Sequence, residues 1–256
     1  MARKAKHPVQ TTQKSLDIVE KLGELGSAGV TELAEELGMN KSIVHNHLRT
    51  LEERGYVIVS DEEYSLGLRF FQIGGKIRKD WKLYKRAKSE IDKTASEIQA
   101  SVNLAVEENG KCVYLYRACE DQSIDLEFSY EGMYEHMHQA AVGKAILAYL
   151  PRDRVEAIVD RHGLPQRTEH TITDFDELME NLGQIRDRGY AIDDEESILG
   201  LRCVAAPIKT SDEEVLGSIS ISGPKSRFKN DTWSRELPEK VRDASNVIEL
   251  QFVGRS

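Results

Sequence analysis

The sequence has few cysteines and no long hydrophobic run, and these absences exclude several classes of protein. Cys112, Cys119 and Cys203 are odd in number and widely spaced, which gives neither a disulfide framework nor a zinc pattern. No apolar stretch approaches the roughly 20 residues that span a bilayer, and the N-terminal stretch MARKAKHPVQTTQKS lacks the apolar block of a secretory signal. We therefore expect reduced thiols and a cytoplasmic protein with no membrane partner.

The formal net charge of −9 disfavours a polyanionic partner at first sight. The charge is uneven, however, because residues 1–70 hold nine Lys and Arg against eleven Asp and Glu, whereas residues 71–100 hold eight against four. The acidic excess therefore lies in the C-terminal two thirds. A nearly neutral N-terminal part with a basic arm at Arg3, Lys4 and Lys6 permits local contact with DNA. A solvated surface without such a partner fits the charge equally well.

Three short helices are predicted in the first 54 residues. Apolar residues recur at helical spacing from 10 to 25 and from 31 to 37, and Thr31 and Asn40 are candidate caps for the second and third helices. The tight turn GMN between those two helices makes a helix-turn-helix. Two strands around the polar tip at 61–63 follow, which completes a winged-helix pattern, and residues 71–99 return to helix and include a basic linker.

The third predicted helix carries two opposed stripes. Val44, Leu48 and Leu51 form an apolar face, and the opposite face is polar. In a helix-turn-helix the second helix of the motif, here the third predicted helix of the chain, lies in the major groove of DNA. There an Arg side chain can pair with guanine and an Asn side chain with adenine. A polar face that only meets water is the alternative, but the three helices, the turn and the wing together favour DNA binding. The candidate DNA-binding residues are Lys41, Ser42, His45, Asn46 and Arg49.

The second part of the chain alternates strands and helices, which predicts an α+β domain whose mixed sheet is flanked by helices. A hairpin should turn at Asn109-Gly110. The pattern SISIS at 218–222 places three hydroxyls on one face of a strand. That face either meets solvent or is covered, in which case the hydroxyls need partners such as a bound ligand. Helices are expected near 143–150, 152–162, 175–188 and 232–250, and further strands at 189–192, 203–209 and 216–222.

Cys203 and the pair His136 and His138 raise two other possible functions, an enzyme and a metal-binding protein. Cys203 as a nucleophile would need a neighbouring base, and no motif surrounds the nearest histidines, so we do not expect an enzyme. His136 and His138 could hold a metal on one face of a strand together with a cysteine, although no third ligand is visible. A metal- or redox-responsive regulator is therefore the alternative function, and no cofactor is expected.

Four sequence blocks resemble the IclR family of transcription regulators. The first is VTELAEELGMNKSIVHNHLRTLEERGYV followed by YSLGLRF, which is similar to that family's winged helix-turn-helix; the others are HQAAVGKAILAYL, RGYAIDDEESILGLRCVAAPI and GSISISGPKSRF. The resemblance covers residues 9–250. It implies a winged helix-turn-helix domain at 1–70, a linker helix at 71–82 and, at 83–256, a GAF-like effector-binding domain with a mixed or antiparallel sheet.

The resemblance also implies a site and partners. The family's polar ligand contacts fall on Asp193, Cys203, Ser220 and Ser222, and its backbone-lined wall falls on Ala141 and Val142. Members that bind small oxo-acids tend to have smaller residues at that wall, so the bulkier QAAV is a departure. We expect a dimer or a dimer of dimers on a palindromic DNA operator. The expected effector is a small organic molecule, either an organic acid or a sugar-derived compound.

Overall fold

The computed structural model describes residues 6–119 and 130–253, which belong to two compact units, Ala2–Lys79 and Asp80–Ser256. Of the predicted basic arm, Arg3 and Lys4 lie outside the described residues, and Lys6 is exposed. None of the described helices is long and apolar enough to cross a bilayer.

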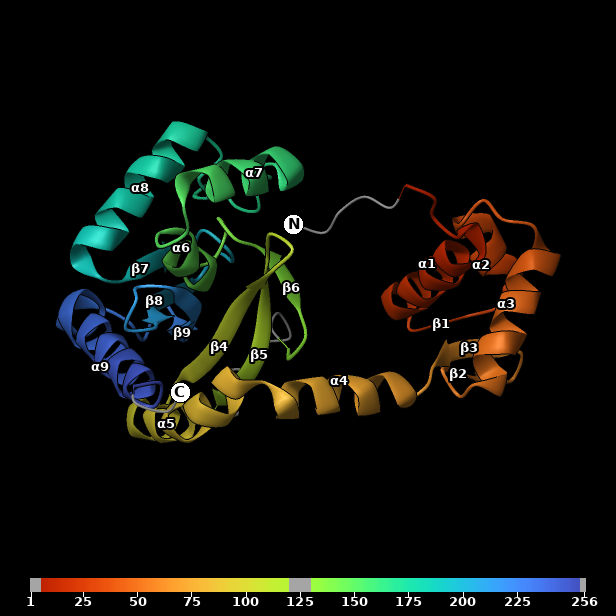
Figure 1. Ribbon diagram of the computed structural model, residues 1–256, viewed down its shortest axis with the longest axis horizontal. Helices are drawn as coiled ribbons and strands as arrows, with labels where there is room; N and C mark the ends of the chain where they lie inside the picture. The colour runs from red at the N-terminus through yellow and green to blue at the C-terminus, as the bar shows by residue number, and fades with distance from the viewer. Residues whose placement is uncertain (1–5, 120–129, 254–256) are drawn as a thin grey trace. The chain divides into compact units, whose positions relative to one another are not determined.

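The N-terminal unit is a winged helix-turn-helix (Figure 1). Its core combines apolar side chains of the three helices with Ala28, Val57 and Tyr64 of the strands, and the helical members Leu22, Leu33, Val44 and Leu48 are completely buried. The predicted apolar face of the third helix is therefore confirmed. The elements are α1 (Gln10–Leu25), β1 (Ser27–Ala28), α2 (Val30–Glu36), α3 (Lys41–Glu53), β2 (Val57–Ser60), β3 (Glu63–Leu66) and α4 (Arg69–Asp80).

Local hydrogen bonds set the ends of these helices. Asn40 caps α3 as predicted, because its side-chain oxygen accepts a hydrogen bond from the backbone N–H of Ser42 at 2.8 Å. The predicted cap at Thr31 is wrong, since the N-cap of α2 is Gly29, two residues earlier, and Thr31 lies within the helix. The wing turns at Asp61 and Glu62, whose positive φ angles of 51° and 69° suit a tight two-residue hairpin turn.

The C-terminal unit is built on a six-stranded sheet in the order β6-β5-β4-β9-β8-β7. Every described pair is antiparallel, so of the two expected sheet types the antiparallel one is found. The strands are β4 (Ser101–Glu108), β5 (Lys111–Cys119), β6 (Tyr134–His136), β7 (Ala191–Asp194), β8 (Leu201–Lys209) and β9 (Val215–Pro224). The helices are α5 (Lys82–Ile98), α6 (Ala141–Leu147), α7 (Arg152–His162), α8 (Phe175–Arg188) and α9 (Leu237–Leu250), and a short π-helix, η1 (Thr232–Glu236), precedes α9.

Helices cover both faces of this sheet (Figure 1). Ile219 and Ile221 of β9 pack in the core that also contains α5 and α9. The alternating residues Ser218, Ser220 and Ser222 lie on the opposite face, and all three are buried. The prediction that the hydroxyls share one face is confirmed, and the solvent-facing alternative is wrong because α6 packs against this strand.

Some boundaries differ from the sequence prediction. The helix expected across 71–99 is interrupted at Trp81, whose extended backbone (φ −68°, ψ 121°) separates α4 from α5. The hairpin at Asn109-Gly110 is confirmed, with positive φ at both turn residues. The expected final helix begins with the π-helix η1, and two short strands, β1 and β6, were not predicted.

Candidate functional site

The polar face of α3 is exposed along its length. The five candidate DNA-binding residues, Lys41, Ser42, His45, Asn46 and Arg49, are all exposed. Arg49 Nη1 forms an ion pair with Glu52 Oε2 at 2.7 Å, but 60% of the arginine side chain remains accessible. With the apolar side of the helix in the core, these side chains are available to an outside partner.

A small cavity lies in the C-terminal unit between the sheet and α6. Its volume is about 30 Å³, enough for one or two water molecules. The six residues singled out in this unit all line it, although they come from four separate elements or segments: Ala141, Val142, Asp193, Cys203, Ser220 and Ser222. The sequence analysis missed several other lining residues, notably Asn103, Tyr114, Glu135 and Ser197.

Asn103 of β4 lies beside the two cavity-lining serines of β9. Its Nδ2 donates to Ser220 Oγ and Ser222 Oγ, each at 3.3 Å. Its Oδ1 is buried and has no hydrogen-bond partner among the described residues. A buried amide oxygen without a partner lowers the stability of the folded state, and this atom can still accept a hydrogen bond. The third serine, Ser218, donates to the carbonyl oxygen of Val142 at 2.9 Å and ties β9 to α6.

Asp193 is held at the end of β7 by its own loop. Its Oδ1 accepts the backbone N–H of Glu196 at 2.7 Å and of Ser197 at 3.2 Å, and its Oδ2 accepts the Ser197 hydroxyl at 2.5 Å. Burial raises the pKa of the Asp193 carboxyl. Cys203 pairs with Asp193 across β7 and β8, and burial together with that carboxylate holds the pKa of its thiol well above the ordinary value.

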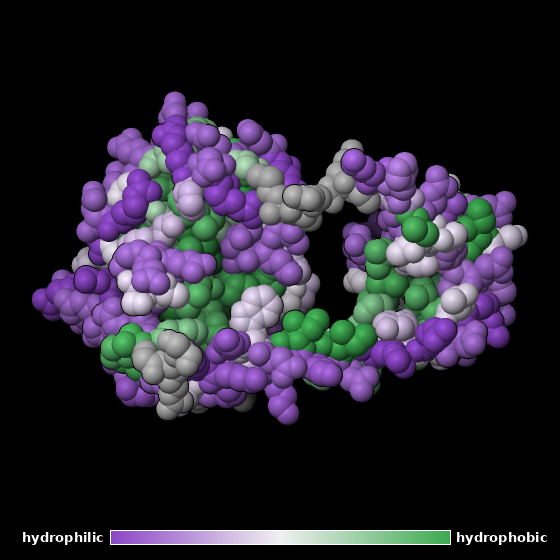
Figure 2. All heavy atoms as spheres, viewed as in Figure 1, coloured by the Kyte–Doolittle hydropathy of each residue, from purple (hydrophilic) through white to green (hydrophobic). Residues whose placement is uncertain are grey.

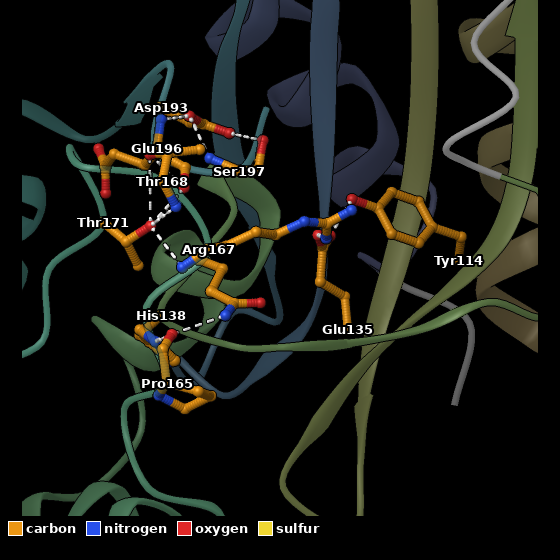
Figure 3. A network of polar contacts seen from close by, with 11 residues as sticks. Tyr114, Glu135, His138, Pro165, Arg167, Thr168, Thr171, Asp193, Glu196 and Ser197 are labelled. Atoms are coloured by element: carbon orange, nitrogen blue, oxygen red, sulfur yellow. Dashed lines mark hydrogen bonds and ion pairs between the residues drawn. The ribbon is translucent and has the colours of Figure 1, made fainter. Parts of the chain in front are cut away.

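Glu135 brings a second buried carboxyl group to the cavity (Figure 3). Tyr114 donates its hydroxyl to Glu135 Oε2 at 2.9 Å, and Arg167 Nη1 contacts Oε1 at 2.5 Å. Burial raises the pKa of this carboxyl, while the arginine and tyrosine oppose the shift. The sequence offered little signal for Glu135, because it lies on a three-residue strand whose pairing is long-range.

A buried ion pair anchors α6 beside the cavity. Lys144 is completely buried, and its Nζ lies 2.5 Å from both carboxylate oxygens of Glu196. Thr168 and Thr171 donate hydroxyls to the backbone oxygens of residues 195 and 196, which fixes the same loop (Figure 3). This network orders the segment that carries Asp193.

The arrangement does not match metal or nucleophilic chemistry. In residues 6–119 and 130–253 no group of three or more His, Cys, Asp or Glu could hold a metal ion. His138 Nε2 lies 3.1 Å from the carbonyl oxygen of Pro165, and no histidine is among the residues that line the cavity with Cys203. A thiol with a raised pKa is a poor nucleophile. The geometry is that of a small cavity with polar lining residues.

Comparison with known proteins identifies the family. Residues 11–58 match the IclR helix-turn-helix domain, and residues 76–250 match the bacterial transcriptional regulator IclR C-terminal domain. The chain belongs to the IclR family. It is 32% identical over 248 residues to the probable HTH-type transcriptional regulator ArcR of Halobacterium salinarum, covering 95% of this chain and 94% of that protein.

Solved structures of IclR-family proteins have the same fold. The crystal structure of the Thermotoga maritima IclR matches with a TM-score of 0.77 at 26% identity, covering 95% of this chain and 98% of that one. An IclR homolog from Microbacterium hydrocarbonoxydans, solved in complex with 4-hydroxybenzoate, matches with a TM-score of 0.77 at 19% identity, covering 93% and 98%. At that identity the second likeness concerns the fold alone.

This IclR-family chain is thus a DNA-binding transcription regulator with a winged helix-turn-helix and an effector-binding domain of the IclR type. The expectation of a regulator rather than an enzyme is confirmed by its relatives. The interpretation as a transcription regulator with a small-molecule effector holds over a metal-responsive regulator, a redox-responsive regulator and an enzyme.

Proposed function

We propose that this regulator reads its operator with the polar face of α3 and that a small organic molecule in the C-terminal cavity changes its affinity for DNA. The observation that carries the second part is a cavity lined by all six residues expected to bind an effector and by Asn103, whose buried Oδ1 has no hydrogen-bond partner among the described residues. A few placed polar groups in a closed pocket are what small-ligand specificity requires. Because its operator is DNA, we place the function in the cytoplasm.

The residues that we propose to contact the operator are Lys41, Ser42, His45, Asn46 and Arg49. Arg49→Ala should weaken operator binding by about 1–3 kcal/mol without unfolding the domain, because the side chain is exposed. Glu52→Gln is the matched control, since it breaks the same ion pair but keeps the arginine, and it should not weaken binding.

The operator for this test comes from genomic fragments captured by the purified protein and sequenced. Binding is then titrated at fixed salt for wild type and both variants. Equal affinities of the wild type and Arg49→Ala would contradict the assignment of this helix face.

Residues 1–70 are proposed as the DNA-binding domain, 71–82 as the linker helix and 83–256 as the effector-binding domain. The two compact units, Ala2–Lys79 and Asp80–Ser256, and the break at Trp81 support a division in this region. Under this proposal α4 connects the two functions.

The regulator is further proposed to act as a dimer or a dimer of dimers on a palindromic operator. One recognition helix reads only a few base pairs, and two-fold assembly doubles the contact. None of the residues of α4 is buried, and Phe71, Ile73 and Ile77 are exposed apolar side chains on it. Figure 2 shows hydrophobic surface in the region of this helix. A second copy of α4 is the occupant we propose for that surface, with nearby Lys and Arg left for phosphates.

Sedimentation with and without DNA tests the assembly. Phe71→Glu combined with Ile77→Glu should shift the protein to a monomer while the fold persists, because both side chains are exposed in one chain. The matched control is Leu250→Glu on α9, which is also exposed and apolar but lies outside α4. A wild type that sediments as a monomer under both conditions rules out the proposal.

The effector is proposed to contact Asp193, Cys203, Ser220 and Ser222, with Ala141 and Val142 as a wall. An effector regulates only if it prefers one arrangement of the DNA-binding domains, and a preference of about 1–3 kcal/mol changes operator affinity roughly 5- to 150-fold. Ser220→Ala combined with Ser222→Ala should reduce the effector response and leave ligand-free DNA affinity nearly unchanged. A hit from a thermal-shift metabolite screen that stabilises this variant and wild type equally would place the pocket elsewhere.

A further inference from the structure

Helix α4 carries two adjacent glycines, Gly74 and Gly75, near its middle. Only proline is a poorer helix former, and each glycine lowers the equilibrium constant for the helical state about fourfold relative to alanine. The pair together therefore weakens the helix roughly twentyfold. Two such residues in the middle of a helix of 12 residues need a physical reason.

Neither glycine is required by packing or by the backbone of its own chain. A Cβ atom at either position would meet no atom within 4 Å, whereas a Cβ atom at Gly67 would lie 2.7 Å from the carbonyl oxygen of Gly55. Neither Gly74 nor Gly75 has a positive φ, so alanine could adopt the same conformation. The two glycines thus weaken α4 without a contact that compensates for the loss.

Aromatic contacts hold the two ends of α4 but not its middle. Near the start of the helix, the ring of Phe70 packs edge-on against Tyr56 of the N-terminal unit, with the ring centroids 5.0 Å apart. Directly after its end, Trp81 is partly buried against the core of the C-terminal unit. None of the residues of α4 is buried, and a helix of this length has little stability in water without packing. The glycines between these two anchors are therefore the point at which α4 bends or unwinds most readily.

We propose that Gly74 and Gly75 form a flexible joint that lets the two winged helix-turn-helix units of a dimer bind half-sites at more than one spacing. The glycines are then specificity-determining residues for the operator. This inference rests on the proposed function, because it assumes a dimer on a palindromic operator. One additional base pair between the half-sites moves them apart by about 3.4 Å and rotates one relative to the other by about 35°. A stiff α4 has to strain to follow this change, whereas a joint absorbs it.

The joint is compatible with pairing of α4 between two copies of the chain. The exposed side chain of Phe71 precedes the glycines and that of Ile77 follows them, so paired helices can keep apolar contacts on both sides of the bend. A flexible joint must be ordered when the dimer binds its operator, and this ordering lowers the affinity. Replacing the glycines should therefore tighten binding at the preferred spacing and reduce the tolerance of other spacings.

Gly74→Ala combined with Gly75→Ala tests the joint in the full-length protein. The probes are synthetic duplexes made from an operator captured from genomic DNA, with the spacing between its half-sites changed by one or two base pairs in either direction. The quantity measured is the spacing penalty, which is the Kd at a changed spacing divided by the Kd at the preferred spacing. This penalty should be about five- to twentyfold larger in the double-alanine variant than in the wild type. Hydrogen exchange of the α4 amides in the DNA-free protein should slow by a similar factor.

Two further variants separate flexibility from other roles of the glycines. Gly183→Ala in α8 is the matched control, because it changes a helical glycine whose Cβ would approach only the end of the Arg186 side chain, at 3.7 Å. It should leave the spacing penalty unchanged. Gln72→Gly, added to the double-alanine variant, restores a glycine at an exposed position of α4 and should lower the penalty again about fourfold.

The outcomes distinguish the joint from the assembly on which it rests. Equal spacing penalties in the wild type and the double-alanine variant overturn the joint and leave the dimer on its operator standing. A double-alanine variant that sediments as a monomer also overturns the joint, because the glycines would then be the crossing point of two α4 helices. If the wild type binds one half-site as tightly as two, the proposed assembly is refuted and the joint with it.

Discussion

Replacing Lys144 by Met should strongly destabilise the C-terminal unit. The lysine is completely buried, and its ammonium group lies 2.5 Å from both carboxylate oxygens of Glu196, whose side chain is 12% exposed. Met keeps the length and packing of the chain but leaves the carboxylate without its counterion. Breaking a buried pair in this way costs about 3–5 kcal/mol. Burial already raises the pKa of Glu196, so its protonation limits the loss and we expect the lower end, about 3 kcal/mol.

Thermal unfolding measures this loss. Both tryptophans, Trp81 and Trp233, lie in the C-terminal unit, so their fluorescence reports its unfolding and not that of the winged helix. A loss of about 3 kcal/mol in a unit of this size lowers Tm by about 6–12 °C. Lys240→Met is the matched control, because Lys240 pairs with Glu97 at the surface with both side chains about 40% exposed. It should cost less than about 1 kcal/mol.

A double variant separates the pairing from packing. Adding Glu196→Leu to Lys144→Met removes the stranded carboxylate and should recover part of the lost stability, which gives a coupling of about 0.5–3 kcal/mol. If Lys144→Met is as mild as Lys240→Met, or if the two substitutions are additive, the ion pair does not anchor α6 as argued.

Leu48→Asp places a charge in the core of the N-terminal unit and should abolish its cooperative unfolding and all DNA binding, which circular dichroism and an operator titration measure. Gly143→Ala should cost about 1–3 kcal/mol in chemical denaturation, because its Cβ would lie 2.1 Å from the carbonyl oxygen of Met137. Gly75→Ala on α4, whose Cβ meets nothing within 4 Å, should be neutral or stabilising. Burial lowers the pKa of His136 from 6.5 to about 4, so the unfolded chain takes up a proton first and stability falls as pH drops through this window. His136→Gln should flatten that part of the stability curve, and identical curves for the two proteins contradict the assignment.

The local patterns of this chain could be predicted from its sequence. The opposed stripes of α3, the cap at Asn40 and the turn at Asn109-Gly110 depend on residues within one or two helical turns or one hairpin. The alternation at 218–222 likewise assigned three hydroxyls to one face of β9. The stripes and the alternation are periodicities of the backbone, and the cap and the turn are local residue preferences, so neighbouring residues reveal all of them without knowledge of the fold.

Other features depended on contacts between distant residues. The break at Trp81 and the strand β6 have no strong local signal, since β6 has three residues and is defined by pairing with β5. Asn103 becomes a cavity residue because β4 pairs with β9, more than a hundred residues along the chain. Glu135 becomes a buried acid because β5 and Arg167 enclose it.

The sequence by itself determined which faces of its helices and strands are apolar, and with them the winged helix-turn-helix and the α+β class. The tertiary structure alone decided that Asn103, Glu135 and Asp193 share one cavity and that Arg167 and Lys144 are already paired beside it. The physical reason is that periodicity records whether a side chain is buried, whereas the partner that the side chain meets is set by strand order and long-range packing.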